Sequence, residues 1–355
     1  MFQKALWLRT YQQSKYVLWL FWFVSLYNLS YKYYLASIEQ QYLLKMQKEG
    51  EYVYHYNFGL LLMDPVIFQG GALIILACTL IGWERQNNSI DFLWSMPFKR
   101  SHLFMTKWLF GICNIVAAVS INWGLFAIMK KLTFHNKYQV FSPFHSYFIY
   151  MLIVLIAIYT LALCIGTITG NLISQGLLTA AIFIFPLLLP TLISGVIAVH
   201  SNIDFHENNG NMHRVMENMR ISGPAENFTI RFDYDPQSSY IDDDDGVRHN
   251  EPNFTKIPSA KLLIAPIIYI IILLPLSLYL YVRSVNERNG SFLLYPKFQK
   301  IVMSLAIFFM GIVGGLVLGR DKSLLNFYIG FFVTSIITYF LLPKILKWKV
   351  SWNFK

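Results

Sequence analysis

The feature that most limits the fold is a run of 66 residues, 138–203, without a single Asp, Glu, Lys or Arg. A helix that crosses the hydrocarbon layer of a bilayer needs about 20 residues, so this run is too long for one crossing and suits two. A break near residues 166–175 would separate them. Only 14% of the chain is charged, whereas soluble domains carry about a quarter. The sequence therefore predicts an all-α, polytopic integral membrane protein and excludes a soluble enzyme.

Six further charge-poor runs bring the expected number of transmembrane helices to about eight. The predicted spans are 16–31, 65–83, 108–129, two within 138–203, 262–282, 301–319 and 323–343. Residues 2–12 predict a short interfacial helix with Phe2, Leu6 and Trp7 toward lipid; the alternative is a frayed start of the first span. Three regions follow from this count. Residues 1–200 hold the interfacial helix, five spans and a cytosolic loop at 84–107, residues 201–258 form an extracellular insert, and residues 259–355 hold three spans and a cytosolic tail.

The distribution of basic residues predicts that both termini lie in the cytoplasm. With eight spans, Lys and Arg number 15 on the side of the termini and 14 on the other side. Long translocated loops count little toward orientation, and without the five basic residues of 201–258 the second number falls to 9. The net charge of +10 is dispersed between apolar runs. It therefore indicates a positive-inside protein of the cell membrane and not a nucleic-acid partner.

The insert at 201–258 predicts a small α+β unit. Apolar residues recur at helical spacing over 212–219, and apolar and polar residues alternate over 228–234, which predicts a helix followed by a strand. The acidic run 242–245 resembles a calcium loop at first sight, but the register fails because Ile241 and Pro252 occupy ligand positions. A solvated acidic loop is the favoured interpretation.

The loop 84–107 contains the most informative pattern in the chain. Asn88 can cap a short helix whose third position is Asp91, and Pro97 ends it because the residue before a proline disfavours helix. The helix carries Phe92, Leu93 and Trp94, which are apolar in a loop that should face water. Exposed aromatics on such a helix suit docking onto a cytosolic partner, or equally a helix that lies in the membrane interface. The residues alone do not separate these two interpretations.

This loop resembles the corresponding loop of ABC-2 type permeases, the membrane subunits of one class of ATP-driven transporter. The family pattern places an acid, a small turn residue and an apolar stretch before Leu-x-Ser-x-Pro-x-x-Arg, followed by a Lys. This chain matches it with Glu84, Asn88-Ser89, Leu93-Trp94-Ser95-Met96-Pro97, Arg100 and Lys107. Asn88 departs from the glycine that is usual in the family. The layout with two added C-terminal spans is similar to that of the YtrC/YtrD-like permeases of Gram-positive bacteria.

The resemblance implies a permease subunit of an ATP-driven exporter, coupled to separate ATPase subunits by a cytosolic coupling helix. The residues it assigns to that contact are Glu84, Asp91, Phe92, Leu93, Trp94, Pro97 and Arg100. It implies no cofactor on this chain and ATP-Mg on the partner, and it implies a second permease subunit, identical or homologous. The sequence contains no GxxxxGK(S/T) motif, so ATP hydrolysis is assigned to the partner and this chain is expected not to be an enzyme.

Gly311, Gly315 and Gly319 form a small-residue face in the seventh predicted span. Such a face permits close helix packing, and packing within the chain is favoured over dimerisation. Two rival functions remain. A membrane-embedded enzyme acting on lipid or cell-wall precursors would require converging polar residues within the spans, and Asn114, Asn122, Asn171 and Thr160 do not form an obvious set. A sensor would bind its ligand at the insert 201–258.

Overall fold

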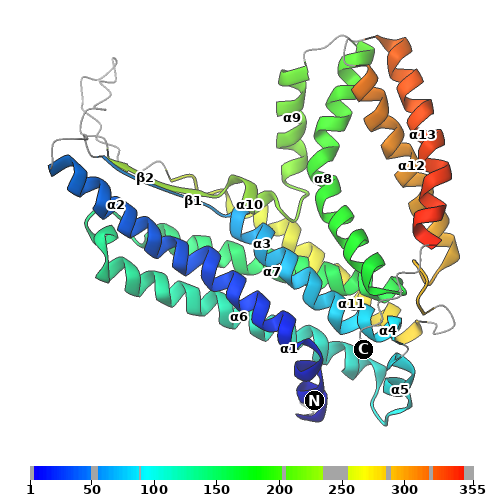
Figure 1. Ribbon diagram of the computed structural model, residues 1–355, viewed down its shortest axis with the longest axis horizontal. Helices are drawn as coiled ribbons and strands as arrows, with labels where there is room; N and C mark the ends of the chain where they lie inside the picture. Colours follow the sequence, from blue (N-terminus) through cyan, green and yellow to red (C-terminus); the bar gives the residue numbers. More distant parts are fainter. Residues whose placement is uncertain are drawn as a thin grey trace.

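The computed structural model describes residues 4–48, 55–87, 89–201, 205–234, 255–284, 289–319 and 323–347. Within these residues the chain is almost wholly helical, with one two-stranded sheet (Figure 1). The longer helices are α1 (Lys4–Leu26), α2 (Lys32–Lys48), α3 (Met63–Ala77), α6 (Arg100–Leu132), α7 (Ser142–Ile168), α8 (Leu172–Ser201), α9 (Phe205–Glu217), α11 (Ile264–Arg283), α12 (Pro296–Leu318) and α13 (Leu324–Lys347). The shorter elements are α4 (Trp83–Gln86), α5 (Ser89–Ser95), α10 (Gly223–Asn227), β1 (Tyr56–Leu61) and β2 (Thr229–Tyr234).

Seven helices of the described chain are long and apolar enough to cross a membrane. They are Met63–Gln86, Arg100–Leu132, Ser142–Ile168, Leu172–Ser201, Ala260–Arg283, Pro296–Leu318 and Leu324–Lys344. Each coincides with one of the predicted spans to within a few residues or extends beyond it, and both spans expected within 138–203 are present. The polytopic, helical membrane architecture is therefore confirmed.

The first predicted span, 16–31, is not among these seven. It lies in a continuous helix, because a π-helical turn at Tyr27–Tyr31 joins α1 to α2. Tyr, Trp and Asn residues dilute the hydropathy of this stretch, and the inward face of α1 carries the buried polar residues Thr10, Ser14 and Ser25. Residues 4–12 are the first turns of this same helix, and Leu6 is buried inside the protein, so it does not face lipid as was expected. Phe2 lies outside the described residues.

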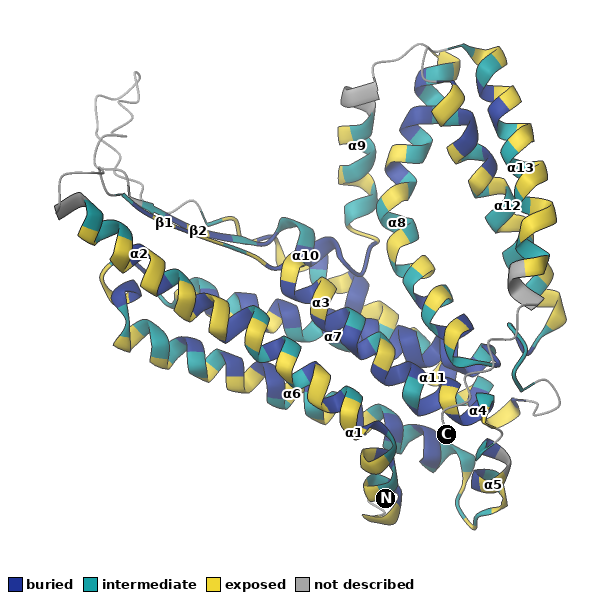
Figure 2. Cartoon of the chain, in the orientation of Figure 1, coloured by how far each residue is buried: buried dark blue, intermediate teal, exposed yellow. Residues whose placement is uncertain are grey.

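The core follows α7, which packs against α3, α6, α8 and α11. Most of its side chains are buried, because a helix that is apolar on all sides can be surrounded by other helices. Exposed residues gather on the outward faces of α2, α12 and α13 (Figure 2). The exposed faces of α12 and α13 are apolar and fit a lipid environment, whereas that of α2 also carries Lys32, Glu39 and Lys45.

The loops lie in two sets, one where the helices converge and one at the far ends of the helices (Figure 1). At one end Arg85 donates from Nη1 to the carbonyl of Thr169 at 3.0 Å, and Arg100 donates from Nη1 to the carbonyl of Val282 at 3.0 Å. These contacts join the regions that were expected inside. At the other end β1 pairs antiparallel with β2, and the hydroxyl of Tyr150 donates to the carbonyl of Pro258 at 2.8 Å. We call these the inner end and the outer end.

The insert contains the predicted helix and strand, but both are built onto the rest of the protein. Helix α9 packs against α8, and β2 pairs with β1, a strand that the sequence analysis did not anticipate. Tyr56 lies opposite Tyr234, and Leu61 lies opposite Thr229. Below the sheet a buried network joins Tyr33, Tyr56, His135 and Gln139 through side-chain hydrogen bonds. The acidic run 242–245 lies outside the described residues.

Candidate functional site

The short helix α5 projects from the inner end, as do the first turns of α1 (Figure 1). It begins where Ser89 donates its hydroxyl to the carbonyl of Glu84 at 3.2 Å. It ends at Ser95, whose hydroxyl donates to the carbonyl of Phe92 at 2.8 Å, two residues before Pro97. These limits agree with the helix that the sequence predicts. Asn88 and the side chain of Asp91 lie outside the described residues, so the predicted cap stays a prediction.

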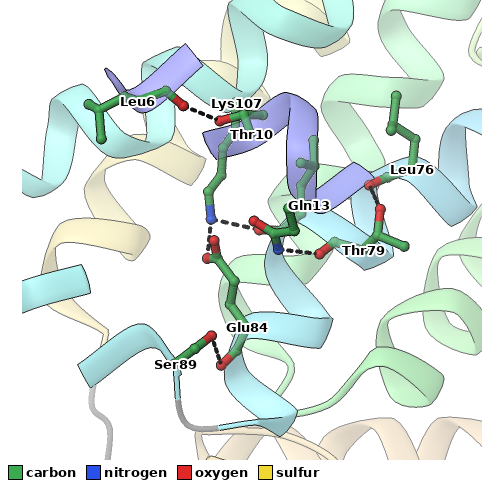
Figure 3. Close-up of polar contacts among 9 residues, drawn as sticks. Leu6, Thr10, Gln13, Leu76, Thr79, Glu84, Ser89 and Lys107 are labelled. Atoms are coloured by element: carbon green, nitrogen blue, oxygen red, sulfur yellow. Dashed lines mark hydrogen bonds and ion pairs between the residues drawn. The ribbon is translucent and has the colours of Figure 1, made fainter. Parts of the chain in front are cut away.

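A buried ion pair ties the start of this loop to α6. The carboxylate of Glu84, at the end of the α3–α4 helix, accepts from the ammonium group of Lys107, and the two side chains are 3% and 5% exposed (Figure 3). Lys107 also donates to the carbonyl of Leu80 at 2.6 Å. Because two charges out of water are costly unless each finds partners, this arrangement fixes the position of α4 relative to α6.

The carbonyl that Lys107 uses belongs to a π-helical turn, Cys78–Gly82. A π-turn interrupts the regular ladder of helix hydrogen bonds and such turns are frequent at functional sites. Here the side-chain amide of Gln13 also donates to the carbonyl of Thr79, at 2.7 Å (Figure 3). The turn therefore receives one hydrogen bond from α1 and another from α6.

Arg100 and Trp94 fasten α5 to α11. The guanidinium carbon of Arg100 lies 3.6 Å from the centre of the Trp94 ring, which is a cation–π contact. Trp94 meets the ring of Tyr281 edge to face, with centroids 6.4 Å apart. Together with the bond from Arg100 to Val282, these contacts hold the end of α5 against the inner end of α11.

The apolar residues of α5 divide between two faces. Ile90 and Leu93 are buried against the protein's own helices, at 1% and 2% exposed. Phe92 is 64% exposed, and Pro97 is also exposed. Of the three apolar anchors predicted for a partner, Leu93 is therefore turned inward, Trp94 is partly covered by Arg100, and Phe92 is the aromatic side chain presented to the outside.

Two residues that matter here were not identified as site residues from the sequence. Arg85 is 1% exposed and reaches across to the corner between α7 and α8, and Tyr281 packs against Trp94 and Phe104. The signal for Arg85 is its charge at the end of a span beside Glu84, since ionisable residues at such positions are usually paired. Tyr281 gave no comparable signal, because it lies within an apolar run.

The polar residues considered for an enzyme are used instead to join helices. Asn114 accepts from Trp22 at 3.3 Å, Asn122 contacts Ser25 and Ser30, and Thr160 accepts from Trp108 at 3.0 Å. Asn171 lies at the inner end. These residues do not converge on one place. Among the described residues no group of three or more His, Cys, Asp or Glu could hold a metal ion.

The glycines of the seventh predicted span face α13. A Cβ atom on Gly311 would lie 2.3 Å from the hydroxyl of Ser335, and one on Gly315 would lie 2.8 Å from the ring of Phe327. A Cβ on Gly319 would lie 2.8 Å from the carbonyl of Gly315 in its own helix and 2.9 Å from Phe327. The structure thus places this small-residue face inside the α12–α13 hairpin.

Comparison with known proteins identifies the family. Residues 16–284 match the model of the ABC-2 family transporter proteins. The chain belongs to the ABC-2 transporter family. It is 28% identical over 282 residues to the probable ABC transporter permease YtrD of Bacillus subtilis. The aligned region covers 77% of this chain and 77% of that relative. It is 25% identical over 243 residues to the probable ABC transporter permease YtrC of the same organism, which covers 68% of this chain and 66% of that relative.

No solved structure matches the chain. The family and the seven apolar helices make this protein a multi-pass membrane permease component of an ABC transporter. The resemblance inferred from the loop 84–107 is thereby confirmed. The α12–α13 hairpin lies beyond the part of the chain that the family model matches.

Proposed function

We propose that this protein is the membrane subunit of an ATP-driven exporter and that α5 is the helix through which a separate ATPase subunit drives it. The observation that carries this proposal is the combination of an exposed tip and a fixed base. Phe92 is exposed at the tip, while Glu84, Trp94 and Arg100 tie the base to α6 and α11. A lever needs both features, because a loose helix would move without displacing the helices behind it.

The remainder of the proposal concerns the complete transporter. ATP-Mg binds and is hydrolysed on the ATPase subunits, and this chain holds no cofactor. A second permease subunit, identical or homologous, completes the membrane part, and both termini lie in the cytoplasm. Closure of two ATPase subunits around nucleotide would displace α5 and shift the spans between two arrangements. The names of the Bacillus relatives as probable ABC permeases support this assignment.

The docking of α5 can be tested with a single truncation. Phe92→Ala removes the one exposed aromatic of α5, whose loss from an interface centre typically costs about 2–4 kcal/mol. That cost corresponds to about 30- to 1000-fold weaker association. The spans should fold normally, because this side chain contributes little to the buried core. The assay is recovery of the cognate ATPase with purified permease at matched permease levels.

The matched control is Phe298→Ala, which truncates another exposed aromatic in the first turn of α12. We expect this variant to bind the ATPase as the wild type does. Leu93→Ala is unsuitable as a docking test because Leu93 is buried in the chain's own core. If Phe92→Ala and Phe92→Asp both recover the ATPase fully, α5 does not dock through its exposed face and the proposal is rejected.

A further inference from the structure

The helices form two groups that diverge from the inner end (Figure 1). We call α1–α3, α6, α7 and α11 the α7 arm, and α8, α9, α12 and α13 the α8 arm. Apart from their contact with each other, α12 and α13 pack mainly on α8. Phe185 of α8 meets Phe309 of α12 at 4.2 Å between ring centroids, and His200 bonds to the hydroxyl of Tyr328 at 3.0 Å. The hairpin is therefore expected to move with α8.

At the inner end the chain crosses between the arms twice, and the two crossings are bonded to each other. One is the corner 169–171 between α7 and α8, and the other is the segment 289–294 that precedes α12. The amide of Gly290 donates to the carbonyl of Gly170 at 2.7 Å, and the amide of Leu294 donates to the carbonyl of Ile168 at 3.0 Å. The side-chain amide of Asn171 donates to the carbonyls of Gly290 and Ser291, at 3.3 and 3.4 Å.

The same corner is also bonded to the loop that carries α5. Arg85 lies four residues before α5 and donates to the carbonyl of Thr169, on the residue that forms a β-bridge with Leu293. The backbones approach closely here, since a Cβ on Gly82 would lie 2.7 Å from the Cα of Leu172. Thr169, Leu293 and Arg85 are all almost fully buried. The α5 loop and the start of α8 are therefore in close contact, and a movement of one should displace the other.

We propose that the corner 169–171 and the segment 289–294 form one bonded junction that makes the α8 arm follow movements of the α5 loop. The role of α5 as the driven element rests on the proposed function, but the rigidity of the junction does not. Arg85 acts as a positioning residue, because it holds the corner against the α3–α4 helix. The C-terminal hairpin, which lies outside the family match, is thereby connected to the driving loop.

The test removes hydrogen bonds between the corner 169–171 and the segment 289–294 with a nearly isosteric substitution. Asn171→Asp removes both amide donors to the segment but keeps the oxygen that accepts from the amide of Ser174 at 2.7 Å, so the start of α8 keeps its cap. Gly290→Ala is a second variant, because Gly290 has φ of +83°, which disfavours a residue with a Cβ. Ser291→Ala is the matched control, since it keeps the carbonyl that accepts from Asn171 and removes a hydroxyl that donates to the carbonyl of Leu293 within the segment.

Spin labels at Ile128 of α6 and Leu325 of α13 report the distance between the arms, on a background without Cys78, Cys113 and Cys164. Both label sites are exposed. Pulsed electron paramagnetic resonance is measured first on the permease alone in lipid nanodiscs. We expect Asn171→Asp and Gly290→Ala to broaden the distance distribution about twofold, and Ser291→Ala to leave it as in the wild type.

The measurement is then repeated with the cognate ATPase, with and without ATP-Mg. We expect the nucleotide to shift the distance in the wild type and the control, and to lose that shift in Asn171→Asp although the ATPase still binds. An unchanged distribution and an unchanged shift in both junction variants would overturn the inference. Failure of the wild type to bind the ATPase would instead reject the proposed function. The width of the distance distribution measured without the ATPase would still show whether the junction holds the two arms together.

Discussion

Removing the carboxylate of Glu84 tests how far the inner end depends on its buried ion pair. In Glu84→Gln the ammonium group of Lys107 keeps the carbonyl of Leu80 as a partner but loses its counter-charge. Breaking a buried pair by removing one partner costs about 3–5 kcal/mol. The glutamine oxygen can still accept one hydrogen bond, so we expect a loss near the lower limit, about 3 kcal/mol in the free energy of unfolding.

The assay is reversible unfolding in mixed micelles with increasing SDS, followed by tryptophan fluorescence. The control is Arg231→Ala, which breaks the ion pair with Asp233 in β2, where the two side chains are 49% and 36% exposed. Exposed pairs contribute about 0–1 kcal/mol, so this variant should unfold almost as the wild type does.

A double variant separates the cost of a stranded charge from the contribution of the pair. Glu84→Leu with Lys107→Met removes both charges and leaves apolar side chains in their place. Replacing a buried pair by packed neutral groups is often neutral, so the double variant should recover most of the stability that Glu84→Gln loses. If Glu84→Gln is no less stable than Arg231→Ala, the pair does not anchor α4 to α6 and the reasoning is refuted.

Two further predictions concern the outer end and the topology. Burial lowers the pKa of His135, which lies between α6 and α7. As the pH falls below about 6.5, the unfolded chain therefore binds a proton at this residue before the folded protein does. The wild type should lose more stability between pH 7 and pH 5.5 than His135→Gln, and equal losses would contradict this. On a background without native cysteines, Arg231→Cys and Ser95→Cys, both exposed, should differ in labelling by a membrane-impermeant maleimide in intact cells, with Arg231→Cys labelled; equal labelling of the two sites would contradict the assigned sides.

The span positions could be predicted because charge is costly inside a bilayer. The predicted span 65–83 became Met63–Gln86, and 323–343 became Leu324–Lys344. The third span is longer than expected, Arg100–Leu132, because Lys107 enters the protein and is paired there. A rule that ends spans at charges cannot foresee a charge that is neutralised by a residue 23 positions away.

The limits of α5 could also be predicted, since Ser89, Ser95 and Pro97 act locally. The direction of its side chains could not. A seven-residue helix contains barely two turns, so its sequence does not show whether Phe92 or Leu93 faces inward. That choice depends on α11, nearly 200 residues later in the chain. Strand β1 was missed for a related reason, because its partner β2 is far away in sequence and Gly59 interrupts the strand pattern.

At the inner end, polar contacts between helices gather around one π-helical turn. Backbone carbonyls in a bilayer must find donors within the protein. The π-turn Cys78–Gly82 presents two such carbonyls, and they are taken by Gln13 of α1 and Lys107 of α6. Helix α1 and the two spanning segments that contain α3 and α6 thus meet directly before α5. Moving the π-turn and α4 away from α1 and α6 would strand a charge and two carbonyls, at a cost of several kcal/mol. We therefore expect the ends of α1, α3 and α6 at this turn to stay together when α5 is displaced.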